Sequence, residues 1–442
     1  MNTFLRVACA AAFLLAGSLC RAGGPSIALR INSENGIYAK GDTVRVSAVT
    51  GGVVGDSLLL QVYSYGNILF RKRLLPPSGE TVIYEAAFDE KTSVMLRLGP
   101  ASNPKQGENI GFLVAPEEFL PGFGVPEDLR EYWDRELAAM RSLKPDVTVS
   151  PAVGVSEEDA ALYKCYKIEI NMPSGAPCRA YVAYPRKAAR GSLPIHVRFH
   201  AAGVNRPHVP ARAKDAIAMA KKGCIALDVN AHGILDDQPE YYYRELDKGE
   251  LKDYALRPFT GVGDYYFHNM YLRDIRAIDY ATTLRAWDGK RILLQGGSQG
   301  GGQSLAVAGI DRRVSHVCAI YPAITDTGAS LEGRRPGWPA SVNTRFAGTP
   351  LGKDVMAYHD AAILVSMFEG ALHIEAGNID TVQDPAAVTA AYNNARSACS
   401  RQIFYFPWCG HGGPVSGKKE EWKESVLSFR ESFIDGFLNG SR

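Results

Sequence analysis

The chain has 442 residues, of which 46% are hydrophobic and 22% are charged, the balance of a globular protein long enough for two domains. The formal net charge is only +2, and no basic stripe stands out along the sequence. Composition and charge therefore give no reason to expect a nucleic acid or an anionic membrane as a partner.

The N-terminal segment, residues 1–22, has the pattern of a secretory signal peptide. Arg6 supplies the positive charge, residues 7–19 are apolar, and small residues near position 20 mark a cleavage point. The apolar run is too short to span a membrane, and the residue before Cys20 is not the small one that lipidation needs. We therefore expect an exported protein, secreted or periplasmic, with no membrane span.

Six cysteines follow the expected signal peptide, and none of them has the spacing of metal ligands. Cys224 and Cys318 lie in apolar runs, where a free cysteine usually acts as a small buried hydrophobic residue. Cys399 and Cys409 flank one expected strand, and an oxidising compartment would allow a disulfide between them. The sequence predicts no metal site.

Residues 23–115 contain about seven short alternating runs, separated by turn residues such as Asn35-Gly36 and Pro76-Pro77. This spacing is typical of a small antiparallel sandwich of immunoglobulin type. Residues 116–126, with three prolines and two glycines, indicate a linker. A carbohydrate-binding module and a packing or spacer domain are both open as roles for the sandwich.

Residues 127–442 begin with a helical pattern and a hairpin, and then alternate between apolar strands and helices. This alternation predicts a mostly parallel sheet with helices on both faces and a site at the carboxyl ends of its strands. The expected strands are 195–199, 224–228, 291–295, 317–320, 372–376 and 402–406, and the expected helices are 211–222, 270–284, 299–309, 386–398 and 419–439.

The segment Gly296-Gly297-Ser298-Gln299-Gly300 has the G-x-S-x-G spacing between an apolar run and a helix-like run. That context is typical of the strained elbow that carries a nucleophilic serine, where a Cβ at the first or last glycine would crowd the turn. The following helix directs its free N–H groups toward charge that develops on a bound acyl group. An ordinary glycine-rich turn that happens to contain serine fits the same five residues. Whether Ser298 is a nucleophile therefore depends on whether the chain offers it a base and an acid.

A nucleophilic serine needs a base and an acid that orients the base. His411 lies between glycines in a loop directly after the last expected strand, which makes it the candidate base. Asp380 follows the strand before that and is the candidate acid. Asp326 is the alternative, and Asp384 is a weaker one, because the proline after it indicates a helix cap.

The oxyanion of an acyl-transfer reaction needs two donors. One is the backbone N–H of Gln299, and the other lies in the loop His200-Ala201-Ala202-Gly203 after a strand. His232 also follows a strand end and could contact substrate. The remaining strand histidines, among them His196 and His373, are expected to be structural.

From about residue 119 to 437 the chain resembles the acetyl xylan esterase and cephalosporin C deacetylase family, α/β-hydrolases that remove acetyl groups from oligosaccharides and from cephalosporin C. The run Tyr271-Leu272-Arg273-Asp274 and the run Gly296 to Gly302 carry the match. The resemblance favours Asp380 over Asp326, since Gly377-Asn378-Ile379-Asp380 matches, and it puts His411 where the family has its catalytic histidine. It also implies that the second oxyanion donor lies at or next to Ala202, where the family commonly has tyrosine.

Two departures from the family stand out. Asn230-Ala231-His232-Gly233 replaces an Arg-Gly-Gln run, and Gly412 replaces the glutamate that commonly follows the histidine. Both changes concern the surroundings of the acyl pocket and leave the three candidate catalytic residues in place. The expected sandwich has no counterpart in the minimal family members, which form ring-like oligomers. Their assembly therefore does not carry over to this chain, and its oligomeric state stays open.

The sequence thus predicts a secreted serine esterase that acts on an acetylated oligosaccharide, such as acetylated xylan, or on another small acetyl ester, without a cofactor. Ser298, His411 and Asp380 would form the triad. Two other functions stay open: a serine peptidase of α/β-hydrolase fold, and a carbohydrate-binding protein whose hydrolase domain is inactive.

Overall fold

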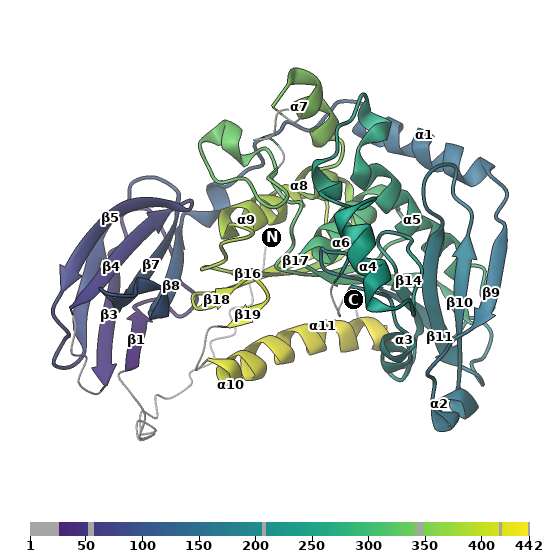
Figure 1. Cartoon of the computed structure of the whole chain (residues 1–442), viewed down its shortest axis with the longest axis horizontal. Helices are drawn as coiled ribbons and strands as arrows, with labels where there is room; N and C mark the ends of the chain where they lie inside the picture. The colour runs from purple at the N-terminus through teal and green to yellow at the C-terminus, as the bar shows by residue number, and fades with distance from the viewer. Residues whose placement is uncertain are drawn as a thin grey trace, which may run out of the picture.

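A computed structural model describes residues 26–51, 57–205, 209–340, 342, 348–414 and 418–440 of the chain. Figure 1 shows a β-sandwich beside a larger layered unit of strands and helices that follows it in the chain. The expected signal peptide, residues 1–22, lies outside the described residues.

The N-terminal region is all-β, as the sequence predicts, and it consists of two sheets. Apart from one short parallel pair, the paired strands are antiparallel. Alternate residues such as Val44, Val46 and Ala48 are buried, because successive side chains of a strand point to opposite faces. One sheet has the order β1 (Ser26–Ile31), β3 (Val44–Gly51), β6 (Thr81–Ala86), and the other β2 (Ile37–Tyr38), β8 (Glu108–Val114), β7 (Thr92–Pro100), β4 (Leu58–Ser64), β5 (Asn67–Leu74).

The second unit contains a nine-stranded mixed sheet, and six neighbouring strands of it are parallel. All six parallel strands and the hairpin that the sequence predicts are present, and one further edge strand, β9, joins them. The order is β17 (Ser400–Phe406), β16 (Ala371–Gly377), β15 (His316–Ile320), β14 (Trp287–Gly297), β12 (Leu193–Phe199), β13 (Ile225–Val229), β11 (Cys178–Pro185), β10 (Tyr163–Ile170), β9 (Val147–Pro151).

Helices cover both faces of this sheet (Figure 1). The C-terminal pattern that predicts one helix over 419–439 is divided in the structure by a π-helical turn at Lys423–Leu427. The α-helices are α1 (Leu129–Ser142), α2 (Glu157–Leu162), α3 (Ala213–Ala220), α4 (Glu240–Lys248), α5 (Tyr266–Ala281), α6 (Gln299–Ile310), α7 (Pro350–Ala357), α8 (Ala361–Leu364), α9 (Pro385–Asn394), α10 (Lys419–Trp422) and α11 (Ser428–Asn439).

The expected linker, residues 116–126, is packed between the sandwich and the second unit. Phe119 is fully buried and joins Leu113 of β8 to Ala386 and Ala390 of α9 in one hydrophobic cluster. The backbone carbonyl oxygens of Pro116 and Phe119 both accept hydrogen bonds from the Asn393 side chain. The two units therefore share a continuous interface.

The structure also bears on membrane spans and on disulfides. Among the described residues, no helix is both long and apolar enough to cross a membrane. The six cysteines after the expected signal peptide are all free thiols, so the disulfide considered between Cys399 and Cys409 is absent.

Candidate active site

Ser298 lies in a tight turn between β14 and α6, with a φ of 54° and a ψ of −122°. A serine has a positive φ only under strain, which the surrounding packing must hold. A Cβ on Gly296 would lie 2.3 Å from the Gly300 carbonyl, and one on Gly300 would lie 2.4 Å from the Phe199 carbonyl oxygen. The glycines that the sequence singles out are therefore required by the close approach of the backbone.

A chain of two hydrogen bonds joins the three candidate residues. The Ser298 Oγ lies 2.7 Å from Nε2 of His411, and Nδ1 of the same ring lies 2.7 Å from Oδ2 of Asp380. Because an ionised carboxylate can only accept, the ring takes the tautomer with hydrogen on Nδ1, and Nε2 accepts from the serine hydroxyl. The arrangement is the one that activates a serine for nucleophilic attack.

Asp380 is oriented by the turn that follows β16. Its Oδ1 accepts hydrogen bonds from the backbone N–H groups of Val382 and Gln383, at 2.8 and 2.9 Å, which leaves Oδ2 for His411. The side chain is 1% exposed, whereas that of His411 is 21% exposed. The carboxylate is thus enclosed, and the imidazole keeps one side open.

The two alternative acids have other partners. Asp326 forms an ion pair with Arg334 at 2.5 Å and accepts a hydrogen bond from the Gly122 N–H in the linker segment. Asp384 caps α9 by accepting from the Ala386 N–H. Asp380 is the one of the three that lies against His411.

A cavity of about 620 Å³ opens beside Ser298 and His411. Ala201 and Ala202, from the expected oxyanion loop, line one part of this cavity, and the rest of its wall is largely aromatic and apolar. The other lining residues are Gly297, Ile320, Tyr321, Trp338, Val382, Gly412, Trp422 and Arg430.

The first turn of α6 is fixed by a buried polar chain. The Tyr254 hydroxyl donates to Oε1 of Gln299, whose Nε2 donates to Gln303 at 3.2 Å, and Gln303 donates to Asp274 at 2.7 Å. The Gln299 side chain therefore points away from the cavity. Its backbone N–H is at the first position of the helix, where helix geometry provides no intrahelical acceptor.

His232 is buried behind the loop of residues 200–203. Its Nε2 lies 3.0 Å from the carbonyl oxygen of Gly203 and its Nδ1 lies 2.7 Å from the Tyr266 hydroxyl. Burial lowers the pKa of this imidazole to about 3, so the ring is neutral. It lines a second cavity of about 390 Å³ instead of the cavity that contains Ser298.

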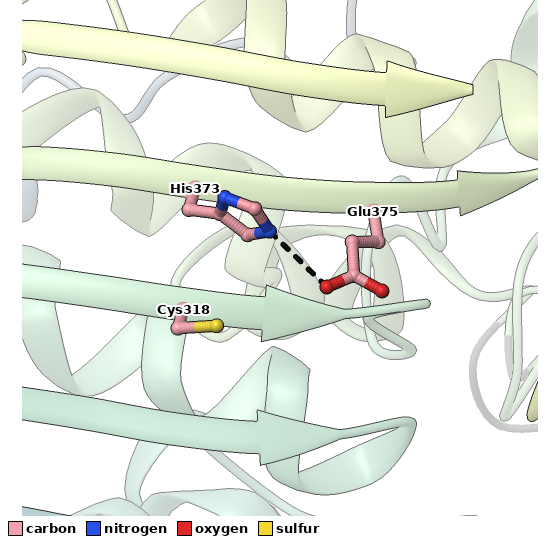
Figure 2. Close-up of side chains that lie close together, drawn as sticks. All are labelled: Cys318, His373 and Glu375. Carbon is pink, nitrogen blue, oxygen red and sulfur yellow. Dashed lines mark hydrogen bonds and ion pairs between the residues drawn. The ribbon is translucent and has the colours of Figure 1, made fainter. Parts of the chain in front are cut away.

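Figure 2 shows a second group of side chains, Cys318, His373 and Glu375, which carry potential metal-ligand atoms and lie on one face of the sheet. They meet because β15 and β16 pair with Cys318 opposite His373, and residues two apart on a strand share a face. Their potential ligand atoms lie within 4.8 Å of one another, a juxtaposition that sequence spacing could not show.

His373 and Glu375 already have hydrogen-bond partners within the protein. His373 contacts Glu375 through Nε2 and Gln402 through Nδ1, while Arg430 holds both carboxylate oxygens of Glu375 at 2.7 and 2.6 Å. Burial raises the pKa of the Cys318 thiol, which favours its neutral form in this apolar setting. We therefore interpret the group as a hydrogen-bond network that fixes Arg430 at the cavity wall.

The mixed sheet, the helices on both faces and the serine elbow at a strand end define an α/β-hydrolase. Residues 117–424 match the family model of acetyl xylan esterase, AXE1, over more than half of the chain. The chain belongs to the acetyl xylan esterase family and is a carboxylic ester hydrolase, as the sequence resemblance implied.

Individual relatives agree with this family. The acetyl esterase Axe7A of Xylanibacter ruminicola is 28% identical over 318 residues, which make up 72% of this chain and 70% of that protein. A solved acetyl xylan esterase from Paenibacillus sp. R4 is 20% identical, with a TM-score of 0.57 over 72% of this chain and 98% of that one. Acetyl xylan esterase 1 from Thermoanaerobacterium sp. JW/SL YS485 is 22% identical, with a TM-score of 0.54 over 73% and 97%.

Several cavity residues are missing from the sequence-based prediction. Tyr321 directly follows β15 and could have been suspected from the rule that sites form at strand ends. Trp338 lies in a long connection, and Trp422 and Arg430 come from the C-terminal helices, more than a hundred residues after Ser298. Only the tertiary fold brings these three to the cavity.

The buried Asp274 gives a prediction on pH and stability. Burial raises its pKa to about 8, so the folded protein holds the proton more tightly than the unfolded chain does. The stability of the wild type, relative to that of Asp274→Asn, is therefore expected to fall as pH rises from about 4 to about 8 and then to level off. Urea unfolding of both proteins across this pH range measures the difference between their free energies of unfolding. A difference that stays constant with pH would contradict the raised pKa of Asp274.

Proposed function

We propose that the chain is an exported serine esterase that removes acetyl groups from carbohydrates such as acetylated xylan or xylo-oligosaccharides. The observation that carries the proposal is His411, whose ring bridges Ser298 and Asp380 in the wall of a cavity. The names of the relatives, acetyl esterase and acetyl xylan esterase, support an acetyl ester as the substrate.

In the proposed reaction, Oγ of Ser298 attacks the acetyl carbonyl carbon while its proton passes to Nε2 of His411. Asp380 stabilises the imidazolium that results. The N–H of Gln299 and a second N–H at or next to Ala202 hold the oxyanion of the tetrahedral intermediate.

His411 then gives the proton to the sugar oxygen as the ester C–O bond breaks, which leaves an acetyl group on Ser298. A water molecule, deprotonated by His411, attacks this acetyl-enzyme, and acetate leaves as Ser298 recovers its proton. Each step uses only groups of the chain, the substrate and water, so the reaction needs no cofactor.

We assign His232 a supporting role in place of the substrate contact expected from the sequence. Its hydrogen bond to the Gly203 carbonyl oxygen lies one residue from Ala202, and its neutral ring cannot change charge near neutral pH. Loss of this contact would let the loop move, and the oxyanion donor with it.

The central experiment compares acetate release from acetylated xylo-oligosaccharides by the wild type and three variants. Ser298→Ala should lower kcat by about 10⁴-fold or more and Asp380→Asn by about 10⁴-fold, because the triad acts as a unit. His232→Phe should lower kcat by about 10²-fold, in the range of a lost oxyanion donor, with little change in KM.

Asp384→Asn is the matched control for Asp380→Asn, since it removes a nearby buried carboxylate that caps α9 and does not touch His411. Its kcat should stay close to that of the wild type. An inactive wild type, or a Ser298→Ala variant that keeps its activity, would overturn the esterase proposal.

Two companion measurements, of peptide cleavage and of xylan binding, separate the two other functions. A peptidase would cleave peptide p-nitroanilides faster than p-nitrophenyl acetate, and family membership argues against this outcome. A binding protein with an inactive hydrolase domain would bind xylan equally well with or without Ser298 and release no acetate.

We also propose that the chain is exported through removal of residues 1–22. N-terminal sequencing of the protein recovered from the periplasm or the medium should begin close to residue 23. Recovery of the protein in the cytoplasm with the segment intact would contradict export.

A further inference from the structure

We propose that the N-terminal sandwich is part of the esterase site: through Gly111 and Asn378 it fixes the two turns that carry Asp380 and His411. This inference rests on the triad proposed above. It gives the sandwich, whose role the sequence leaves open, a positioning function that does not require it to contact substrate.

The first connection is a side-chain contact from the acid turn. Asn378, two residues before Asp380, points into the sandwich and donates Nδ2 to the carbonyl oxygen of Asn35 at 3.0 Å and, more weakly, to that of Gly111 at 3.4 Å. It is 2% exposed. The amide therefore holds the acid turn against two segments of the sandwich.

The second connection reaches the turn of the base. The backbone N–H of Gly111, in the middle of β8, donates to the carbonyl oxygen of Pro407 at 2.8 Å. Pro407 directly follows β17 and leads into the short hairpin of β18 (Cys409–Gly410) and β19 (Gly413–Pro414), whose turn contains His411. One residue of the sandwich thus contacts both turns.

The two turns are also bonded to each other. The Ile379 N–H donates to the Cys409 carbonyl oxygen at 3.1 Å, and the Asn378 N–H donates to the Phe406 carbonyl oxygen at 2.9 Å. A displacement of either turn is therefore transmitted to the other, and it moves Asp380 and His411 relative to Ser298.

The contact at Gly111 leaves no free space. A Cβ on this residue would lie 2.0 Å from the carbonyl oxygen of Asn378 and 3.0 Å from a methyl carbon of Ile379. Since real Cβ atoms do not approach backbone so closely, Gly111→Ala must push the acid turn away from the sandwich. This variant changes the geometry of the seam, the interface along which the sandwich and the linker segment pack against the second unit, without removing a polar group.

Variants at Asn378 and Gly111 test whether the sandwich positions the catalytic groups or only stabilises the fold. Asn378→Asp removes the Nδ2 donor of both hydrogen bonds and places a carboxylate beside two carbonyl oxygens, and Gly111→Ala displaces the turn. Both variants should hydrolyse p-nitrophenyl acetate with kcat lowered roughly 10- to 100-fold and little change in KM, the cost of misplacing catalytic groups by about 1 Å. The rate at which a fluorophosphonate labels Ser298 should fall in parallel.

Two matched controls make the same chemical changes away from these turns. Asn393→Asp removes an amide that bridges two backbone carbonyl oxygens at the other end of the seam, and Gly107→Ala creates an equally close contact, 2.0 Å from the Leu98 oxygen, inside the sandwich. Both should lower the melting temperature and keep kcat near the wild-type value.

Wild-type kcat in folded Asn378→Asp and Gly111→Ala, or an equal loss of kcat in the controls, would overturn the positioning role. If Asn378→Asp does not fold, Asn378→Ala removes the donors without adding charge and takes its place. Ser298→Ala, assayed alongside, keeps the two proposals apart. An active Ser298→Ala variant refutes the triad, whereas an inactive one with fully active seam variants refutes only the role of the sandwich.

Discussion

The hydrogen bonds on the two sides of the His411 ring are the interactions on which the arrangement of this molecule depends. They require three segments that are far apart in the chain to meet within 2.7 Å at each contact. Ser298 comes from the elbow after β14, Asp380 from the turn after β16, and His411 from the hairpin after β17. Parallel pairing brings the carboxyl ends of these strands to one edge of the sheet, and the loops make the final approach.

Close backbone approach is the second constraint. Glycines allow it at the elbow, where Gly296 and Gly300 face other backbone atoms, and at the seam, where Gly111 faces the turn of Asp380. The strain at Ser298 persists because these contacts leave the turn no other path. The sandwich, the acid turn and the hairpin of His411 therefore behave as one packed assembly, and the linker segment with Phe119 extends it.

The sequence predicts the features that have a local signal. Strand periodicity locates the parallel strands, the G-x-S-x-G spacing locates Ser298, and position after a strand end makes His411, Asp380 and Asp326 candidates, among which the family resemblance favours Asp380 over Asp326. The same rule puts His232 near the site but does not give the direction of its side chain, which points to the Gly203 carbonyl oxygen. Trp338, Trp422, Arg430 and the contact between Gly111 and Asn378 depend on tertiary packing alone, and no local period announces them.

The central claim is that acyl transfer passes through Ser298, and the most direct measurement is mass spectrometry of peptides from the enzyme quenched rapidly during turnover of p-nitrophenyl acetate. The account predicts one added acetyl group on the peptide that contains Ser298 and none on that peptide from Ser298→Ala. Active enzyme that carries no acetyl group there, or carries it on another residue with the kinetics of turnover, would contradict it.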